Sequence, residues 1–388
     1  MNILIIHPEG NSLNNPTLKC LIDLVEEKGG NLILSYRNRG RPIMKSNKAT
    51  LYPYGKMLDI FKRLVYDVLE FDFICFVLAY SNVYRIKKEI DVIIGVDRYG
   101  LIDAYFISKI LHKPYVFISF EIFYEEETSV KFKRIEKKAG SDVSLWIVQD
   151  DLRADDVASE NNLDLSKKLL IPLASRGLPM TTINRLRDDL KIPVEKKVAI
   201  VIGSISKWSM VEKIIQNLQY WSDEWVLIVH ERYGDTKEML SGISSMVGSL
   251  SLEGKLYISN KASDTVDEMG FILNGVDLGL AFYLEDGESI YTGKNIRNIG
   301  YASGKISTYF RYGVPVITNI SGKYSEEILD KKCGILVDHP SDISSHLYLI
   351  SKCDRGKNAQ KFYSDNLDFQ KFENKLWSSL KRLYKSHL

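Results

Sequence analysis

The sequence has few of the features on which specialised protein classes depend. Its four cysteines, Cys20, Cys75, Cys333 and Cys353, show no CxxC spacing, so we expect reduced structural thiols rather than a disulfide framework. The longest apolar run, FDFICFVLAY, is about half as long as a membrane-spanning helix. The start, MNILIIHPEG, lacks the basic stretch of a secretory signal. These absences predict a cytoplasmic protein, and they leave open a position on the inner face of the membrane.

One-sided charge and cofactor motifs are missing as well. The 52 Lys and Arg nearly cancel the 50 Asp and Glu, which gives no indication of a nucleic-acid partner. The six histidines form no HExxH pattern, and no other metal-ligand spacing occurs, so we predict no metal site. A P-loop and a GxGxxG motif after a strand are absent, which argues against nicotinamide chemistry. The sequence therefore predicts no cofactor.

Short apolar runs alternate with helical stretches along the whole chain of 388 residues, which is long enough for two domains. This pattern is typical of an α/β fold with two doubly wound, Rossmann-like domains that face each other across a cleft. The predicted strands are 2–7, 31–36, 71–78, 91–97, 114–120, 144–149 and 168–173 in the first half, and 197–204, 224–230, 255–260, 276–283, 314–319 and 334–338 in the second.

The halves are separated by a polar stretch that contains two prolines and has no sheet period. We predict an N-terminal domain at 1–175, a linker at 176–196 and a C-terminal domain at 197–360. Residues 361–388 carry apolar side chains at helical spacing, so we expect a helix that packs back on the first domain. Such sheets bind ligands beyond the carboxyl ends of their strands, which would place one ligand on each wall of the cleft.

The stretch ASGKISTYFRYGVPVITN (302–319) is the most informative one. Ser303 is a good N-cap for a helix that begins near Lys305, and Gly304 allows close approach to a ligand. Gly313 would end this helix, and VPVIT reads as a buried strand. A cation is disfavoured at a helix N-terminus unless an anion lies there too, so the position of Lys305 favours a phosphate partner. A solvated lysine in the first turn is the alternative interpretation.

A second anion site is predicted at IVIGSISKW (200–208), where Gly203 and Ser204 follow a strand and Lys207 opens a helix. An ordinary strand–turn–helix connection is an equally good interpretation of that stretch.

Upstream of Lys305, a long polar loop spans 283–305, and loops of this length are commonly functional. Its acidic residues are suited to sugar hydroxyls and its basic residues to phosphates. His7 and His230 end predicted strands where a ligand would bind, although a structural role is the commoner one for such histidines. The charged residues of the loop are Glu285, Asp286, Glu288, Lys294, Arg297 and Lys305.

These motifs together resemble the donor-binding half of the two-domain GT-B glycosyltransferases. The similarity to family 4 is carried by GKISTYFRYGVPVITN and the following SEEILDKKCGILVD. In that family a lysine, a short helix, a glycine and the sequence PVI come first, and a run that contains a glutamate, an isoleucine, a glycine and a valine comes next. Four residues of this chain fit that run: Glu327, Ile328, Gly334 and Val337. VIGSISKW resembles the first strand and turn of that domain, and YISNKASDTVDEMGFILNGVDLGLAFY resembles its base-binding region. The resemblance covers 200–340, and the first half is similar in layout only.

The resemblance implies metal-independent transfer of a sugar from a nucleotide sugar, such as a UDP-sugar, to a glycan or lipid-linked acceptor in surface polysaccharide or glycoconjugate synthesis. Residues 197–360 would bind the donor and 1–175 the acceptor. The implied catalytic residues are Lys305, Lys207, Glu288 and Glu285. The implied binding residues are Gly203, Ser204, Lys207, Ser303, Gly304, Lys305 and Thr308 for the diphosphate, Ile258, Ser259 and Asn260 for the base, and His7, Asp97 and Glu121 for the acceptor.

The sequence also departs from this family. Members commonly carry two glutamates whose positions are taken here by Gly300 and Thr308, so an acidic residue of 285–288 would take over the first contact. Phe120 stands where relatives have a histidine. The donor base and sugar, the linkage and the anomeric outcome therefore stay open. Two alternatives also remain: a nucleotide-sugar epimerase of similar layout, and a non-catalytic protein that binds a nucleotide sugar or glycan.

The segment 36–64 is strongly basic and holds Asp59 as its single acidic residue. Aromatic residues lie among the cations, so the segment is suited to an anionic membrane surface or a lipid diphosphate. A solvated surface is the alternative interpretation. The cations are Arg37, Arg39, Arg41, Lys45, Lys48, Lys56, Lys62 and Arg63, and the aromatic residues include Tyr52, Tyr54 and Phe61.

Overall fold

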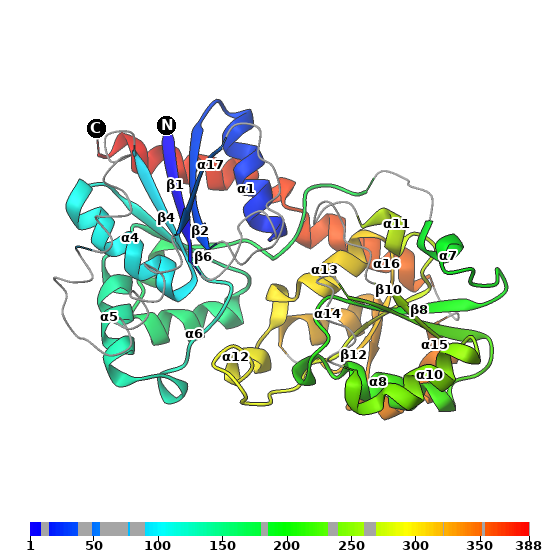
Figure 1. The fold of residues 1–388 in the computed structure, drawn as a ribbon. Helices are drawn as coiled ribbons and strands as arrows, with labels where there is room; N and C mark the ends of the chain where they lie inside the picture. Colours follow the sequence, from blue (N-terminus) through cyan, green and yellow to red (C-terminus); the bar gives the residue numbers. More distant parts are fainter. Residues whose placement is uncertain are drawn as a thin grey trace. The chain divides into compact units, whose positions relative to one another are not determined.

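The computed structural model describes residues 1–8, 15–37, 49–54, 77, 90–179, 185–231, 240–259, 269–320, 322–350 and 354–387. The chain forms two compact units, each built around its own sheet (Figure 1). Unit 1 comprises Met1–Ser175 and Phe369–Leu388, and unit 2 comprises Arg176–Asp368. The chain thus returns to its first unit with the last helix.

The sheet of unit 1 is entirely parallel, with the strand order β3-β2-β1-β4-β5-β6-β7. Strand β3 runs through TLYPY, inside the basic segment for which we had predicted no strand. The remainder of that segment beyond residue 37, apart from 49–54, lies outside the described residues, as does the predicted strand 71–78 except for Val77. The strands are β1 (Asn2–His7), β2 (Asn31–Arg37), β3 (Thr50–Tyr54), β4 (Val92–Val96), β5 (Tyr115–Ile118), β6 (Leu145–Val148) and β7 (Lys168–Leu170).

Helices cover both faces of this sheet because its strands are apolar on both sides. Along β1, Leu4 and Ile6 belong to one core cluster, whereas Ile3 and Ile5 belong to the other. The first cluster includes residues of α4 (Asp97–Leu111), α5 (Val130–Ser141) and α6 (Asp151–Asn161). The second includes residues of α1 (Pro16–Glu27) and of α17 (Gln370–Lys385). Short 3-10 turns lie at Glu125–Glu127 and Leu165–Lys167.

Unit 2 repeats this plan with six parallel strands in the order β10-β9-β8-β11-β12-β13. The strands are β8 (Lys197–Ile202), β9 (Trp225–His230), β10 (Leu256–Ser259), β11 (Leu278–Ala281), β12 (Val316–Thr318) and β13 (Gly334–Leu336). The helices are α7 (Arg185–Asp189), α8 (Val211–Asn217), α10 (Ser244–Leu252), α11 (Gly270–Leu273), α12 (Lys294–Arg297), α13 (Gly304–Arg311), α14 (Lys323–Lys331), α15 (Ile343–Ile350) and α16 (Arg355–Phe362).

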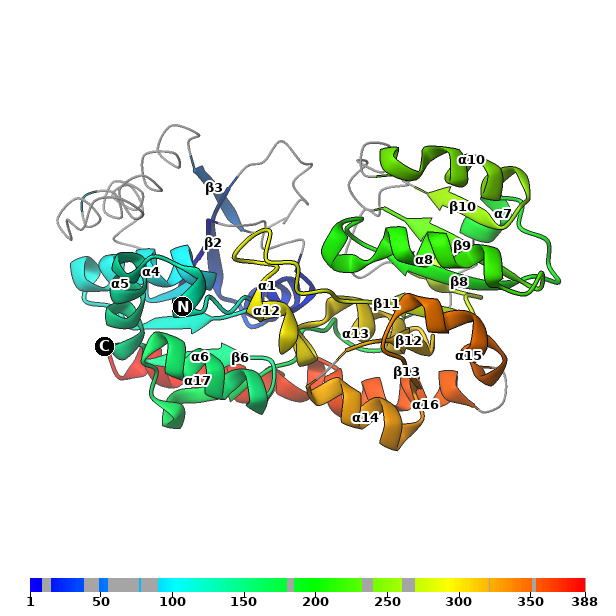
Figure 2. The same cartoon turned by 90° about the horizontal axis from the view of Figure 1, so that it is seen from below.

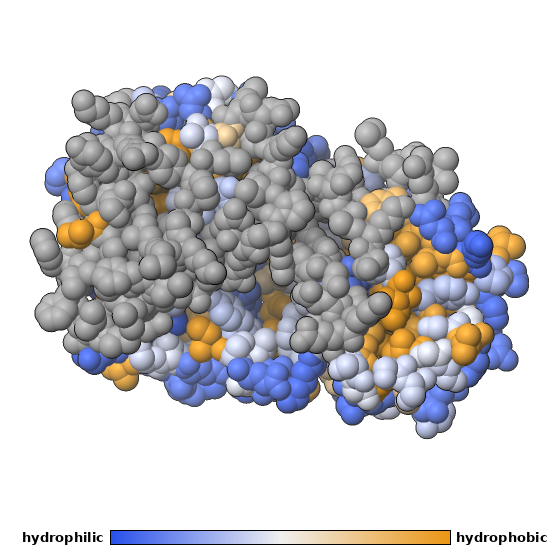
Figure 3. All heavy atoms as spheres, in the orientation of Figure 1, coloured by the Kyte–Doolittle hydropathy of each residue, from blue (hydrophilic) through white to orange (hydrophobic). Residues whose placement is uncertain are grey.

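Helices also lie on both faces of the second sheet. Figure 2 shows α8 and α10 beside β9 and β10, and α14 and α16 beside β12 and β13. On the face of unit 2 drawn in Figure 3, hydrophobic side chains gather in the region of β8 and β10, and hydrophilic ones occupy the rim. Short turns lie at Lys207–Ser209, Leu218–Tyr220, Ser241–Ile243, Gly300–Ala302, Pro340–Asp342 and Tyr363–Leu367.

The stretch that we predicted as a linker belongs to unit 2 from Arg176 onwards. It contains the short helix α7, which packs against α11. The guanidinium of Arg311 donates to the carbonyl oxygens of Gly177 (2.8 Å) and Arg176 (3.0 Å). The start of this stretch is therefore fixed to helix α13 by hydrogen bonds.

In each sheet the chain reverses its direction of winding at one point, between β1 and β4 and between β8 and β11. Open parallel sheets bind ligands outside the carboxyl ends of the strands at such switch points. His7 ends β1 and Asp97 follows β4, whereas Gly203 follows β8 and Tyr283 lies just beyond β11. His7, Asp97 and Gly203, three of the predicted site residues, thus lie at these two sheet edges.

Candidate functional site

The edge of unit 2 is organised around Lys305. Helix α13 begins at Gly304, and the Oγ of Ser303 accepts a hydrogen bond from the Ile306 amide at 3.2 Å, as predicted for this N-cap. The Nζ of Lys305 lies 4.8 Å from the ring centre of Trp208 and 5.8 Å from that of Tyr283. Both distances fall within the range of cation–π attraction. The ammonium is therefore held by aromatic faces.

The neighbours of Lys305 support one another. The rings of Trp208 and Tyr283 stack with centres 6.1 Å apart and planes inclined by 26°. The Tyr283 hydroxyl is 2.5 Å from the Oγ of Ser303, the residue that caps α13. We call Lys305, Trp208, Tyr283 and Ser303 the lysine cage. Sequence reasoning missed the two aromatic members, although Trp208 directly follows the predicted Lys207 and Tyr283 is the last residue of the predicted strand 276–283.

Gly203 leaves room for this arrangement. A Cβ atom at this position would lie 3.2 Å from the Cε of Lys305, which is tighter than ordinary packing. Its φ of +96° is also one that favours glycine. The backbone of Gly203 donates to the carbonyl of His230 at 3.2 Å, which continues the ladder between β8 and β9. The structure thus places Gly203 against the side chain of Lys305.

The electrostatics of Lys305 are unusual for a lysine. It forms no ion pair with any carboxylate in the described ranges, and the residue is half-buried. Burial of the ammonium lowers the pKa of Lys305 to about 8. A desolvated cation without a counter-charge is stabilised when an anion arrives, so this position is suited to an anionic ligand.

The acidic residues of the loop before α13 form ion pairs with nearby cations. Glu285 receives a bidentate contact from Arg297 with distances of 2.9–3.1 Å. Glu288 pairs with Lys207 at 2.8 Å, and both side chains are exposed. The pairing raises the pKa of Lys207, chiefly through the hydrogen bond to Glu288. The structure thus brings two predicted catalytic residues together, and their contact is with each other rather than with Lys305.

The other predicted donor residues lie around the same sheet edge. Thr308 is half-buried on α13, one turn beyond Gly304. At the end of β10, the Oγ of Ser259 lies 3.1 Å from Nδ1 of the buried His230. The predicted base residues Ile258 and Ser259 therefore end the strand next to β9, and Asn260 lies outside the described residues. Ser204 is half-buried in the turn after Gly203.

In unit 1, the corresponding edge holds a buried carboxylate. Asp97 directly follows β4 with a φ of 54°, a strained value for a non-glycine residue. Its Oδ1 accepts hydrogen bonds from the amides of Phe120 (2.7 Å) and Glu121 (3.1 Å). Burial raises the pKa of Asp97 to about 6, and these hydrogen bonds oppose the rise. The structure thus brings the predicted residues Asp97 and Glu121 together, and His7 is buried at the end of β1.

Two further residues hold this edge in place. The fully buried Arg153 donates to the carbonyl of Phe120 at 2.7 Å and to the Oε1 of Gln149 at 3.0 Å. Gln149 in turn donates to the carbonyl of Ser119 at 2.7 Å. Burial lowers the pKa of Arg153. Sequence reasoning missed both residues, because an arginine among the acidic residues of DDLRADD has the pattern of a solvated surface.

In the described ranges, no group of three or more His, Cys, Asp or Glu side chains is placed to hold a metal ion. No helix within those ranges is both long and apolar enough to cross a membrane.

Comparison with known proteins gives matches in structure alone. No family model matches the chain, and no curated protein matches it either. Anabaena HepE in complex with UDP-glucose is 14% identical, with a TM-score of 0.70 over 98% of this chain and 100% of that one. Sucrose-phosphate synthase from Thermosynechococcus elongatus is 11% identical, with a TM-score of 0.73 over 100% of both chains. A glycosyltransferase from Rickettsia africae is 12% identical, with a TM-score of 0.70 over 99% of this chain and 98% of that one. The predicted fold is confirmed: the chain has the two-domain, Rossmann-like architecture of GT-B glycosyltransferases.

Proposed function

We propose that this protein is a glycosyltransferase that uses a nucleotide-sugar donor. The observation that carries the proposal is the Lys305 ammonium, held without a carboxylate partner in the described part of the chain at the switch point of unit 2. It lies in the first turn of α13, whose free amides also favour an anion. Among structures of the same fold, HepE binds UDP-glucose and a trehalose-6-phosphate protein from E. coli binds UDP-2-fluoro-glucose. These ligands support a sugar diphosphate as the anion.

The lysine cage would act on the leaving group. When the sugar–phosphate bond breaks, negative charge grows on the nucleoside diphosphate, and fixed cations and amides at that place lower the barrier. Lys305 and the first amides of α13 would supply this stabilisation, so the proposed reaction needs no metal ion. Lys207 would join them once it exchanges Glu288 for the diphosphate. Glu288 or Glu285 would then contact the donor sugar.

We assign the acceptor to unit 1. Asp97 is fixed by two backbone amides, and its pKa of about 6 allows it to exchange a proton near neutral pH. It would accept a hydrogen bond from the acceptor hydroxyl, with Glu121 and His7 beside it at the sheet edge. A glycan or lipid-linked acceptor is supported by another structure of this fold, WaaG, which takes part in lipopolysaccharide biosynthesis.

A thermal-shift screen with nucleoside diphosphates and nucleotide sugars tests the donor site, because a ligand that binds the folded state raises the melting temperature. We expect one base to stabilise the wild type, and Lys305→Ala to lose most of that shift. The matched control is Lys323→Ala, which removes a lysine of the same unit that lies 4.0 Å from Glu327. The donor site would be refuted if no ligand stabilised the protein, or if both variants responded alike.

Product analysis with the stabilising nucleotide sugar separates the proposed reaction from its two alternatives. A transferase releases the nucleoside diphosphate and forms a glycosylated acceptor. An epimerase converts the nucleotide sugar without any acceptor. A non-catalytic protein binds the ligand and releases nothing, an outcome that the absence of glutamates at Gly300 and Thr308 makes worth testing.

A further inference from the structure

Helix α17 has two unlike sides. Its apolar side, with Phe369 just before it and with Leu376 and Leu380, is buried in a core of unit 1. Its opposite side is exposed and basic. The exposed positions 371, 375, 378, 382 and 385 follow one stripe of the helix, with 381 beside it. We call the cations of this side, Lys371, Lys375, Lys381, Arg382 and Lys385, the basic ridge.

The basic ridge has no counter-charges in the described part of the chain. Two lysines of other helices do have them: the half-buried Lys19 pairs with Asp23 at 2.7 Å, and the exposed Lys361 pairs with Asp365 at 2.8 Å. Among the described residues, the ridge cation Lys381 contacts an aromatic ring, with its Nζ 5.5 Å from the ring centre of Trp377. Lys371 and Lys375 are four residues apart, as are Lys381 and Lys385, and like charges at this spacing repel.

Helix stability does not account for this arrangement. The helix dipole favours cations in the last turn, which suits Arg382 and Lys385. The same dipole disfavours a cation in the first turn, where Lys371 lies. The acidic residue of the first turn, Glu373, is half-buried and lies on a different side of the helix. The ridge thus costs stability in the isolated protein, and an external anion would relieve that cost.

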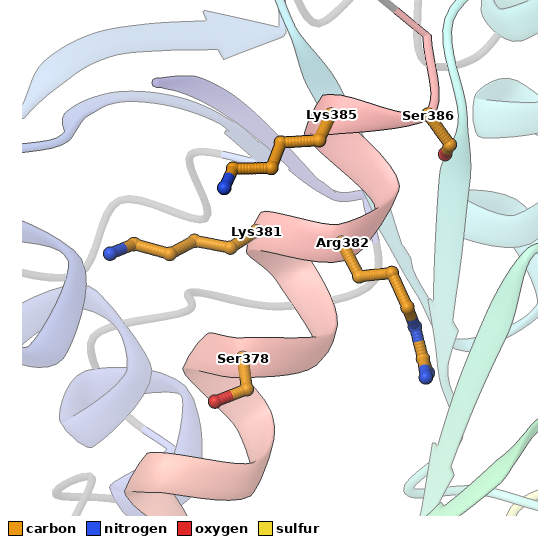
Figure 4. Close-up of a pocket in the computed structure, with 5 residues that line it drawn as sticks. All are labelled: Ser378, Lys381, Arg382, Lys385 and Ser386. Atoms are coloured by element: carbon orange, nitrogen blue, oxygen red, sulfur yellow. The ribbon is translucent and has the colours of Figure 1, made fainter.

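Near the C-terminal end of α17, the ridge borders a hollow of ≈ 560 Å³ lined by Ser378, Lys381, Arg382, Lys385 and Ser386. Figure 4 shows Lys381 and Lys385 extending to the same side of the helix and Arg382 extending to the other. Lys381 and Lys385 therefore extend together on one side of the helix, and a pair of cations suits phosphate oxygens.

We propose that the basic ridge docks unit 1 on an anionic lipid surface. Its five charges extend over about 21 Å, given a rise of 1.5 Å per residue. The helix is packed into the unit along its length and presents a single face, which suits a flat bilayer better than a nucleic-acid groove. No aromatic residue is fully exposed among the ridge positions, so stacking on bases has no support here. Each cation near an anionic bilayer adds to the attraction.

Vesicle sedimentation of the full chain tests this surface without any turnover. The ridge variant carries Lys371→Gln, Lys375→Gln, Lys381→Gln, Arg382→Gln and Lys385→Gln. The charge-matched control carries Lys28→Gln, Lys131→Gln, Lys213→Gln, Lys331→Gln and Lys357→Gln, all at exposed positions on or next to other helices. We expect the wild type and the control to sediment with vesicles of phosphatidylcholine and phosphatidylglycerol, and not with phosphatidylcholine alone. The ridge variant should bind at least tenfold more weakly.

Raising the salt concentration should release the wild type, because the attraction is electrostatic. The double variant Lys371→Gln/Lys375→Gln should show an intermediate loss, and it protects the test against misfolding of the fivefold variant. Equal losses in the ridge variant and the control would overturn the proposal, since net charge alone would then explain binding. Ridge-dependent binding to duplex DNA or RNA, without binding to anionic vesicles, would overturn it as well.

Discussion

The two sheet edges of this protein have the same topology and opposite chemistry. At the switch point of unit 1, Asp97 is buried and accepts hydrogen bonds from two backbone amides. At the switch point of unit 2, Lys305 lies against the rings of Trp208 and Tyr283. Burial raises the pKa of Asp97 to about 6 and lowers the pKa of Lys305 to about 8. Both groups are thus shifted towards neutrality, in opposite directions.

The difference lies in the partners. Asp97 has donors of its own, so its carboxylate is fixed before any substrate arrives. Lys305 has aromatic faces and no acceptor among the described side chains, and we propose that a ligand supplies its anion. Two sheets of one topology can therefore serve two substrates, with hydroxyl groups at one edge and a diphosphate at the other.

Replacing Lys305 by methionine should have the largest effect on turnover. It tests whether the cation at the edge of unit 2 binds the diphosphate. Loss of a cation at a developing charge costs about 10²–10³ in turnover. The unliganded protein should become more stable at pH 7 by about 1–3 kcal/mol, because its folded state no longer holds a desolvated charge. The gain should vanish as the pH rises towards the ordinary pKa of lysine, where the wild type is uncharged when folded or unfolded.

Initial rates and denaturant titrations at pH 7 and at alkaline pH measure both effects. Lys305→Arg is the control that keeps the charge, and it should retain more activity than the methionine variant. Near-normal turnover in Lys305→Met would contradict the proposed role of Lys305, since unit 2 would then have no anion site at this lysine.

Replacing Asp97 by asparagine tests whether the carboxyl at the edge of unit 1 is desolvated in the folded protein. The Oδ1 of asparagine can still accept from the Phe120 and Glu121 amides. The wild type loses stability as the pH rises from about 4 to about 6, because the unfolded state releases the Asp97 proton over this range while the folded state retains it. The variant avoids this loss and should be about 1–3 kcal/mol more stable at pH 8, and equally stable near pH 4.

Free energies of unfolding across this pH range measure the difference. Asp142→Asn is the matched control, because that carboxylate is exposed and pairs with Lys109 at 2.7 Å. If the free energy of unfolding of Asp97→Asn varied with pH as that of the wild type does, the Asp97 carboxyl would not be desolvated. The two sheet edges would then not differ in the way described above. Turnover should fall in Asp97→Asn even where stability rises, since the proposed contact to the acceptor needs the charge.

The sequence predicted those features that depend on neighbours along the chain. Ser303 as an N-cap and most strands needed only local patterns. Strand β3 was missed because TLYPY lies within a basic segment and contains a proline, which an edge strand tolerates. Helix α7 was missed because its five residues, RLRDD, show no apolar period. Short polar elements of this kind are held by packing that local patterns do not reveal.

The lysine cage and the fixing of Asp97 could not be predicted for a different reason. Trp208 meets Lys305 only because β8 and β11 are neighbours in the sheet, although almost a hundred positions (208 to 305) separate the two residues. Arg153 reaches Phe120 through the order of β5 and β6 in the same way. Strand order is a property of the whole fold, so one stretch of sequence cannot supply it.

Trp208→Leu should have a moderate effect and shows whether the aromatic face serves the cation. Cation–π contacts contribute about 0.5–2 kcal/mol, so binding of the nucleoside diphosphate should weaken about twofold to thirtyfold. Trp208→Phe keeps a ring and should lose less. A merely structural role would weaken binding equally in a Lys305→Met background, whereas our proposal expects almost no further loss there. Calorimetric titration of the four combinations measures this coupling.

Glu288→Gln should have the smallest effect of these substitutions. It shows whether Glu288 contacts the donor sugar or only pairs with Lys207. The pair between Glu288 and Lys207 is exposed, so its removal should leave the melting temperature unchanged. Without Glu288, Lys207 is free to meet an anion, and the nucleoside diphosphate should bind a few times more tightly at low salt. Glu285→Gln, which leaves that lysine paired, is the control. If Glu288 contacts the donor sugar, the intact nucleotide sugar should not share the gain in affinity, and turnover should fall. Equal gains for both ligands would show that Glu288 restrains Lys207 and does nothing for the sugar, leaving Glu285 or Asp286 to hold it.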